Sequence, residues 1–196
     1  MKNNPDEPGR DVLVHVCCAT CALGVVDDLH RRGMGFEGLF YNPNVHPLIE
    51  FRRRLKTCKI MAHQTGPSMR FDEDYGLVEW LRAVVGREDE RCDICYRMRL
   101  TRTAQIARDA GFAAFTTTML VSPQQRHESL RRLGETIADE VGVAFLYQDW
   151  RPLYAQACAE AKNRSLYRQQ YCGCIYSEYE RYRDTGKHLW RPDARS

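Results

Sequence analysis

Pairs of cysteines are the feature of this sequence with the clearest chemistry. Nine cysteines occur among 196 residues, and most of them stand in close pairs. The pairs are Cys17/Cys18, Cys92/Cys95 and Cys172/Cys174. Thiolates bind zinc and iron–sulfur clusters, and paired thiols also carry out redox reactions. The pairs therefore predict a metal site, and the odd number of cysteines argues against a framework of paired disulfides.

The spacing within each pair leaves the identity of the metal open. Cys92 and Cys95 form a C-x-x-C pair at a predicted helix start, which suits half a zinc site, half a cluster site or a redox dithiol. Adjacent side chains are expected to diverge, so Cys17 and Cys18 suit two irons of a cluster better than one zinc. A cubane cluster takes four thiolates. The remaining two either hold a second metal or, as Cys172 and Cys174, form a reversible disulfide.

The other cysteines have less specific surroundings. Cys58 lies on the apolar stripe of a predicted helix, and Cys158 shares a helical face with Tyr154. We expect both in the hydrophobic core, where unpaired cysteine is common. Cys21 follows Cys17 by four residues, so it is a candidate of second rank for the metal site, and burial against a sheet explains it equally well.

Strands and helices alternate along the predicted chain. Strands are expected at residues 11–16, 35–41, 69–74, 112–120 and 143–147. Helices are expected at residues 20–32, from Pro47 through Leu55, at 77–85, 92–110 and 130–141, and over 153–183 with an interruption at 172–174. Gly33 stands where a left-handed residue ends the first helix. This alternation is typical of parallel βαβ units with right-handed crossovers.

The predicted fold is therefore α/β, a doubly wound and mainly parallel sheet of the Rossmann-like, adenine nucleotide alpha hydrolase-like type, with a helical C-terminal segment. Ligands bind such sheets at the carboxyl ends of the strands, and Cys17 and Cys18 stand at one of them. Nucleotide-binding proteins have a glycine-rich phosphate loop there, and this sequence has cysteines instead. We expect a single metal-binding catalytic domain over residues 11–185, between a disordered tail at 1–10 and a C-terminal tail at 186–196.

Composition narrows the class of protein. With 43% hydrophobic and 28% charged residues, the chain has the make-up of a globular protein. Its N-terminus is polar and contains prolines, unlike a signal peptide, and no apolar run approaches the roughly 20 residues of a membrane span. We therefore expect a cytoplasmic protein without a membrane partner. A net charge of +3 permits a nucleic-acid partner without requiring one.

Several segments, in order, resemble the cobalamin-independent epoxyqueuosine reductases, the QueH family. They are residues 14–19 (VHVCCA), 40–44 (FYNPN), 91–95 (RCDIC), 116–118 (TTT) and 167–174 (YRQQYCGC). The resemblance extends over about residues 11–183. One departure is Thr20, where members of the family commonly have proline.

The resemblance implies reduction of the epoxide of epoxyqueuosine in tRNA to the cyclopentene of queuosine. It also implies a [4Fe–4S] cluster with an adjacent mononuclear iron, and an electron donor that the sequence does not identify. By motif, Cys17, Cys18, Cys92 and Cys95 are the candidate cluster ligands. Cys172 and Cys174 are then a redox-active pair or ligands of the additional iron.

The same motifs supply candidates for proton transfer and for substrate binding. The candidate catalytic residues beside the cysteines are Tyr41, Asp93 and Tyr171, with His46 as a further proton donor. The candidate substrate-binding residues are Asn42, Asn44, His46, Arg168 and Gln169. Residues 167–171 mix aromatic, cationic and amide side chains, which suits an unstacked base of the anticodon loop. The basic runs at 52–56 and 97–102 are expected to be solvated helix surfaces as much as tRNA contacts.

Two other functions fit the same residues. A tRNA sulfur-transfer enzyme also combines this type of sheet with cysteine clusters, but it normally activates the base with ATP, and the first loop here lacks a Ser-Gly-Gly phosphate motif. The other is a zinc-stapled RNA-binding module without catalysis, which would hold zinc and no acid-labile sulfide.

Overall fold

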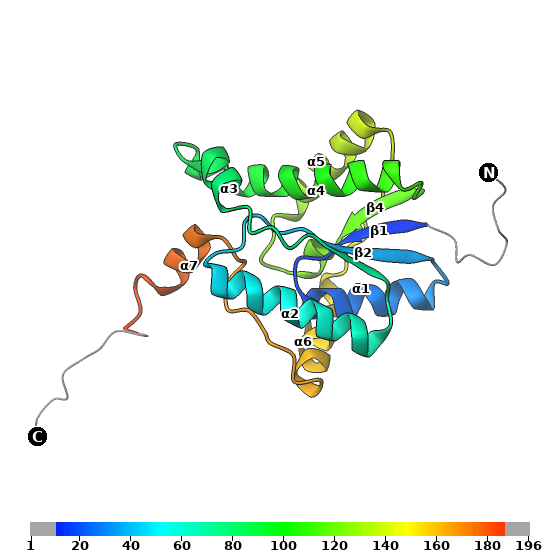
Figure 1. Ribbon diagram of the computed structural model, residues 1–196, viewed down its shortest axis with the longest axis horizontal. Helices are drawn as coiled ribbons and strands as arrows, with labels where there is room; N and C mark the ends of the chain where they lie inside the picture. Colours follow the sequence, from blue (N-terminus) through cyan, green and yellow to red (C-terminus); the bar gives the residue numbers. More distant parts are fainter. Residues whose placement is uncertain (1–10, 187–196) are drawn as a thin grey trace, which may run out of the picture.

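A parallel sheet of five strands organises the computed structural model, which describes residues 11–186 (Figure 1). The strands are β1 (Val12–His15), β2 (Phe36–Phe40), β3 (Met69–Phe71), β4 (Ala114–Thr117) and β5 (Ala144–Phe145). Their order is β3-β2-β1-β4-β5, and every neighbouring pair is parallel. The chain thus winds outward from β1 in both directions, which confirms the predicted doubly wound α/β fold. The predicted tail at 1–10, and the C-terminal tail beyond residue 186, lie outside the described residues.

Helices cover both faces of the sheet. They are α1 (Ala19–Arg31), α2 (Leu48–Thr65), α3 (Leu77–Val84), α4 (Arg91–Asp109), α5 (His127–Val141), α6 (Tyr154–Asn163) and α7 (Ile175–Tyr182). Helices α1 and α2 lie on one face, and α4 and α5 lie on the other (Figure 1). Helix α6 packs on α1, while α7 lies beyond the carboxyl edge of the sheet (Figure 1). None of the helices between residues 11 and 186 has the length and apolar character that crossing a bilayer requires.

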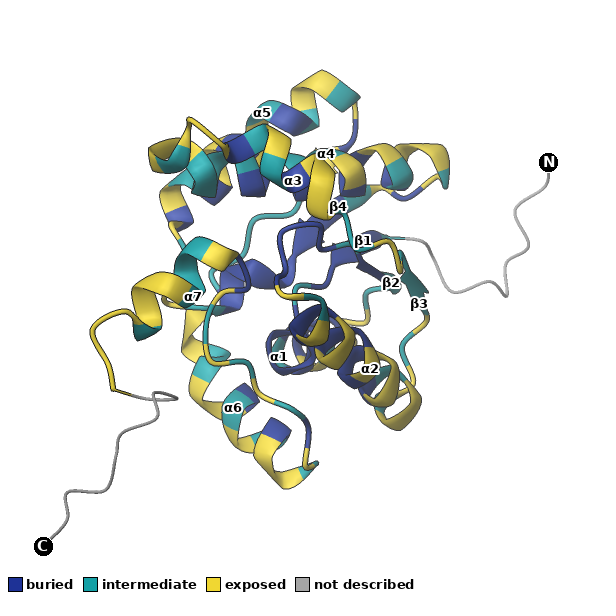
Figure 2. Ribbon diagram, turned by 60° about the vertical axis from the view of Figure 1, so that its left-hand side comes forward, coloured by how far each residue is buried: buried dark blue, intermediate teal, exposed yellow. Residues whose placement is uncertain are grey.

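The central strand β1 is buried on both faces, as Figure 2 shows. Val12, Leu13 and Val14 are at most 3% exposed, which is why this strand reads as a continuous apolar run. His15 ends the run and is fully buried. Its Nε2 donates to the carbonyl oxygen of Tyr41 (3.0 Å), so its Nδ1 accepts from the hydroxyl of Thr117 (2.9 Å). Burial lowers the pKa of His15 to about 4, and a neutral imidazole thereby ties together the ends of β1, β2 and β4.

The C-terminal region differs from its prediction. The helix expected over residues 153–183 ends at Asn163, and residues 164–174 are not helical. Ser165 has a positive φ of 53°, which interrupts the helix, and the following residues bond to α2 and to the first loop. This segment therefore crosses the carboxyl edge of the sheet and brings Cys172 and Cys174 to it.

Candidate metal centre

A cavity of about 640 Å³ lies at the carboxyl edge of the sheet. Its lining comes from the turn between β1 and α1 and the start of α1, from α2, α4 and α6, from residues 119–126, from the segment before α7 and from α7 itself. The cysteines in this lining are Cys17, Cys21, Cys92, Cys158, Cys172 and Cys174. Their neighbours Cys18 and Cys95 are buried, with 2% and 8% of their surface exposed. Each predicted pair therefore contributes at least one cysteine to the lining of this cavity.

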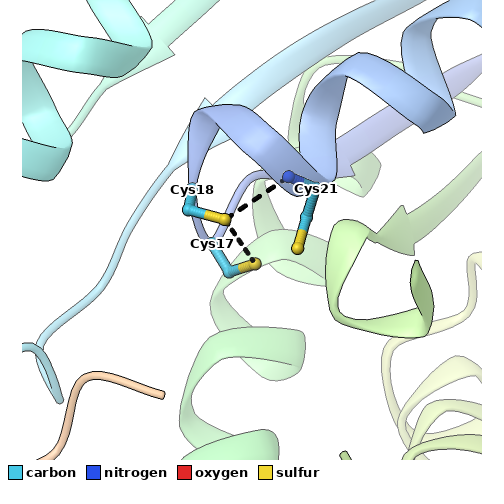
Figure 3. A group of neighbouring side chains, drawn as sticks. All are labelled: Cys17, Cys18 and Cys21. Atoms are coloured by element: carbon cyan, nitrogen blue, oxygen red, sulfur yellow. Dashed lines mark hydrogen bonds between the residues drawn. The ribbon is translucent and has the colours of Figure 1, made fainter. Parts of the chain in front are cut away.

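Cys17, Cys18 and Cys21 form the tightest group of thiols in the described chain. Their sulfur atoms all lie within 4.8 Å of one another, and Figure 3 shows the three side chains turned toward one another. The sulfurs of Cys17 and Cys18 are 3.9 Å apart, so the prediction that these adjacent side chains diverge is wrong. The reason is local, because Cys18 is the extended N-cap of α1 and its Sγ accepts from the Cys21 main-chain N–H at 3.4 Å. Cys21, left undecided by the sequence, belongs to this group.

Hydrogen-bond donors surround the sulfurs of this group. The Thr118 hydroxyl donates to Cys17 Sγ (3.2 Å), and its oxygen also accepts from the Cys17 main-chain N–H (3.0 Å). The thiols of Cys18 and Cys21, followed by Thr118, lower the pKa of Cys17 well below its usual value. From the far end of the chain, Gln169 Nε2 donates to Cys18 Sγ (2.9 Å). Cys17 is thus the thiol of this group that loses its proton most easily, while the hydrogen bonds with Cys17 raise the pKa of Cys18 and of Cys21.

The other two pairs meet one another at the same cavity. Cys92 and Cys95 lie in the first two turns of α4, and Cys95 packs in one buried cluster with Cys174. Cys174 is the N-cap of α7, where its Sγ accepts from the Ser177 main-chain N–H at 3.4 Å. The sulfurs of Cys172 and Cys174 are 3.9 Å apart and unbonded. A hydrogen bond from Cys174 lowers the pKa of Cys172 to about 5, so the more exposed thiol of this pair is the more acidic one.

A buried ion pair holds the Cys172–Cys174 loop in place. Arg54 is 2% exposed and pairs with Glu50 at 2.7 Å. It also donates to the carbonyl oxygens of Cys172 (2.8 Å) and Tyr171 (2.9 Å). The expectation that this basic run forms a solvated surface is therefore wrong for Arg54. The one feature of the sequence that indicates this ion pair is the i,i+4 spacing of Arg54 from Glu50, and exposed helices have the same spacing.

Arginines without ion-pair partners surround the opening of the cavity. Within the described chain, Arg126, Arg168 and Arg181 line the cavity and none forms an ion pair with a carboxylate, whereas Arg91 pairs with Glu180. The lining amides are those of Gln124, Gln125, Gln169 and Gln170. The opening therefore offers positive charge and amide groups to a ligand approaching from solvent.

The predicted proton donors lie in different places. Tyr171 lines the cavity, and its hydroxyl donates to the carbonyl oxygen of His46 at 2.6 Å. Tyr41 and Asp93 are not part of the lining. Asp93 forms an ion pair with Arg132 of α5 at 3.1 Å.

Three of the predicted substrate-binding residues are buried beside the cavity. Asn42 donates from Nδ2 to the Val16 carbonyl oxygen (2.9 Å), and Asn44 is 1% exposed. His46 contacts the Tyr75 hydroxyl through Nδ1 (2.9 Å). The other two, Arg168 and Gln169, line the cavity. Cys58 is fully buried, as predicted, whereas Cys158 is half-buried in the cavity lining, which corrects its assignment to the core.

The donor set of this cavity fits a thiolate-bound metal group. Sulfur is its main donor, and soft thiolates favour zinc, copper(I) and iron–sulfur clusters. Among the described residues of the lining, Glu180 is the one carboxylate and is already paired with Arg91. A second cavity of about 530 Å³, between α1 and α6, has no cysteine in its lining. Of these two cavities, the one at the carboxyl edge of the sheet is therefore the candidate for a sulfur-bound metal.

A parallel α/β sheet with cysteines gathered at its carboxyl edge defines an α/β protein with a thiol site of the kind that can hold a metal. The family model described as epoxyqueuosine reductase QueH matches residues 12–180. An epoxyqueuosine reductase QueH of Dehalococcoides mccartyi is 37% identical over 171 residues, 87% of this chain and 94% of the relative. The protein of the same name from Thermotoga maritima is 36% identical over 180 residues, 87% of this chain and 91% of the relative. This chain belongs to the epoxyqueuosine reductase QueH family, an oxidoreductase family.

Proposed function

We propose that this protein reduces epoxyqueuosine in tRNA to queuosine. The convergence of Cys17/Cys18, Cys92/Cys95 and Cys172/Cys174 on one cavity carries this proposal. Membership of the family supports it, because the relatives are named for this reaction. The domain that acts is residues 11–185, and it works in the cytoplasm on a tRNA substrate with electrons from an external donor.

Four thiolates are proposed to hold a [4Fe–4S] cluster: Cys17, Cys18, Cys92 and Cys95. Cys21 belongs to the same sulfur group as the first two. Cys172 and Cys174 either hold an adjacent iron or act as a redox-active dithiol. When bound, the cluster supplies single electrons, and an adjacent iron supplies Lewis acidity.

The reaction places clear demands on the remaining side chains. Conversion of an epoxide to an alkene breaks both C–O bonds, forms the C=C bond, consumes two electrons and two protons, and releases the oxygen as water. A dithiol such as Cys172/Cys174 supplies two electrons and two protons when it becomes a disulfide. Among the candidate proton donors, Tyr171 lines the cavity, so we propose that its hydroxyl exchanges its bond to the carbonyl oxygen of His46 for the substrate and protonates the oxygen that leaves.

Binding of tRNA is proposed to use the arginines at the opening. Arg126, Arg168 and Arg181 come from different elements and have no carboxylate partner in the described chain, so their charges are free for phosphates. The modified base has to leave its stack to enter a cavity, as in other enzymes that act on nucleobases. Gln169, which already contacts Cys18, then offers its amide to the base.

The test is a conversion assay with a metal measurement beside it. Protein reconstituted without oxygen, with iron and sulfide contents measured, is incubated with epoxyqueuosine-tRNA and a strong reductant. We expect nucleoside mass spectrometry to detect a product lighter by one oxygen, and we expect Cys17→Ala to abolish it. A fully loaded protein that produces no such product would exclude the reductase. A product that forms only with ATP and gains sulfur would assign sulfur transfer instead.

A further inference from the structure

Arg99 is a buried cation without a carboxylate partner. It lies on α4, is 4% exposed and lines the cavity. Its guanidinium donates to the main-chain oxygen of Cys95 (3.2 Å) and to Cys95 Sγ (2.8 Å). No carboxylate in the described chain forms an ion pair with it. Arg54, equally buried on α2, is paired with Glu50 at 2.7 Å.

This burial requires a negative group close by. An arginine side chain stays charged in proteins, and a buried charge is costly unless it is paired. The sulfur that Arg99 contacts is that of Cys95, and the sulfurs of Cys17 and Cys172 belong to residues that line the same cavity. Each of these three cysteines belongs to a different one of the three cysteine pairs. A carboxylate is missing from this position, so the compensating charge has to reside on sulfur.

We propose that Arg99 is a positioning residue of the metal centre, whose fixed positive charge balances the negative charge of metal-bound thiolates from all three cysteine motifs. The inference rests on the proposed function in one respect, that these thiolates hold metal. Two consequences follow. Metal binding is favoured because it provides Arg99 with its partner. Reduction of the bound group is also favoured, because positive charge and hydrogen bonds at the sulfurs raise a reduction potential.

The first test measures that potential. Wild-type protein, Arg99→Gln, Arg99→Lys and the control Arg97→Gln are reconstituted anaerobically, and a redox titration is followed by visible absorption. Arg97 lies two residues away on α4, is 46% exposed and pairs with Glu140, so its loss removes the same charge from the surface. We expect Arg99→Gln to decrease the ratio of reduced to oxidised centre about tenfold at a fixed potential, about 59 mV for a one-electron couple. Arg99→Lys keeps the positive charge, so we expect its reduction potential to stay close to that of the wild-type protein.

The second test separates this role from plain packing. Thermal unfolding is measured for Arg99→Met and wild-type protein, each with and without metal. An unpaired buried charge costs stability, so we expect Arg99→Met to be neutral or stabilising in the metal-free chain and destabilising in the loaded one.

Equal destabilisation in both forms, or an unchanged potential in Arg99→Gln, overturns the proposal while the proposed reductase stands. A wild-type chain that takes up no iron overturns both. A loaded chain with the shifted potential but no conversion of the tRNA overturns the reductase alone.

Discussion

The side-chain amide of Gln169 donates to the sulfur of Cys18 at 2.9 Å, across 151 positions of sequence. Cys18 begins α1 beside the central strand, while Gln169 belongs to the non-helical segment before α7. This contact closes the cavity from the C-terminal side. It also places a neutral hydrogen-bond donor on a candidate metal ligand, next to the proposed entrance for the base.

Replacement of Gln169 by leucine is expected to weaken metal retention. A hydrogen bond to a charged acceptor contributes about 1.5–3 kcal/mol, which corresponds to roughly tenfold or more in an equilibrium. We expect Gln169→Leu to lose iron correspondingly faster to a chelator, followed by absorbance. Gln170→Leu is the control, because the amide of Gln170 donates to the Arg168 carbonyl oxygen and not to sulfur. Equal release rates in the two variants would contradict the role of Gln169.

Cys21 offers a test of the sulfur group that the structure assembles. Its sulfur lies within 4.8 Å of those of Cys17 and Cys18. We expect Cys21→Ala to lower the iron content after reconstitution, measured per chain by a colorimetric assay. Cys58→Ala is the control, since Cys58 is fully buried in the core and its loss should reduce stability without reducing iron. Full iron content in Cys21→Ala would restrict its role to packing.

Arg54 is expected to control the position of the Cys172–Cys174 loop. Removing one partner of a buried ion pair costs about 3–5 kcal/mol, so Arg54→Gln should lower the free energy of unfolding by about that amount. It should also accelerate alkylation of Cys172, measured by mass spectrometry under native conditions. Arg70→Gln breaks the more exposed pair with Glu37 and is expected to cost at most about 1 kcal/mol. Unchanged alkylation in Arg54→Gln would show that the loop holds its position without this arginine.

Arg168 is expected to act on tRNA and not on metal. An arginine that contacts phosphate weakens binding on removal and lowers the salt slope of log K by about 1. We therefore expect Arg168→Ala to bind tRNA less tightly with unchanged iron content, measured by filter binding at several salt concentrations. Arg31→Ala provides the control, because Arg31 ends α1 at the opposite edge of the sheet. Loss of iron in Arg168→Ala would instead assign a structural role.

Acid is expected to destabilise the fold through His46. Burial lowers the pKa of His46 to about 4, from an ordinary 6.5. As the pH falls, His46 therefore takes up its proton in the unfolded chain before it does so in the folded one. Its contribution to the free energy of unfolding is complete above pH 6.5 and declines as the pH falls toward 4, by up to about 3 kcal/mol. His46→Asn should lessen this decline in urea unfolding at pH 7 and 4.5. The exposed His63 should leave it unchanged when replaced by Asn. His15 has the same direction of shift, so part of the decline remains.

The elements of the fold are largely readable in the sequence because their signals are local. The apolar run of β1 predicted a central strand, and Gly33 and Gly142 take the positive φ that ends a helix. The placement of Cys17 and Cys18 at a strand end followed from the same pattern. Strand bounds were predicted too long by one to a few residues, because propensity continues past the last ladder bond.

The site could be predicted only as a set of motifs. The neighbouring sequence gives little that separates the buried Arg54 and Arg99 from the exposed Arg53 and Arg97, because the i−4 partners of the buried pair, Glu50 and Cys95, have a spacing that surface helices also have. The carbonyl oxygen that Arg54 binds in Cys172 is 118 positions away. Helix and strand signals arise between residues a few positions apart, whereas a charge becomes buried or a sulfur becomes a neighbour only when distant segments pack together.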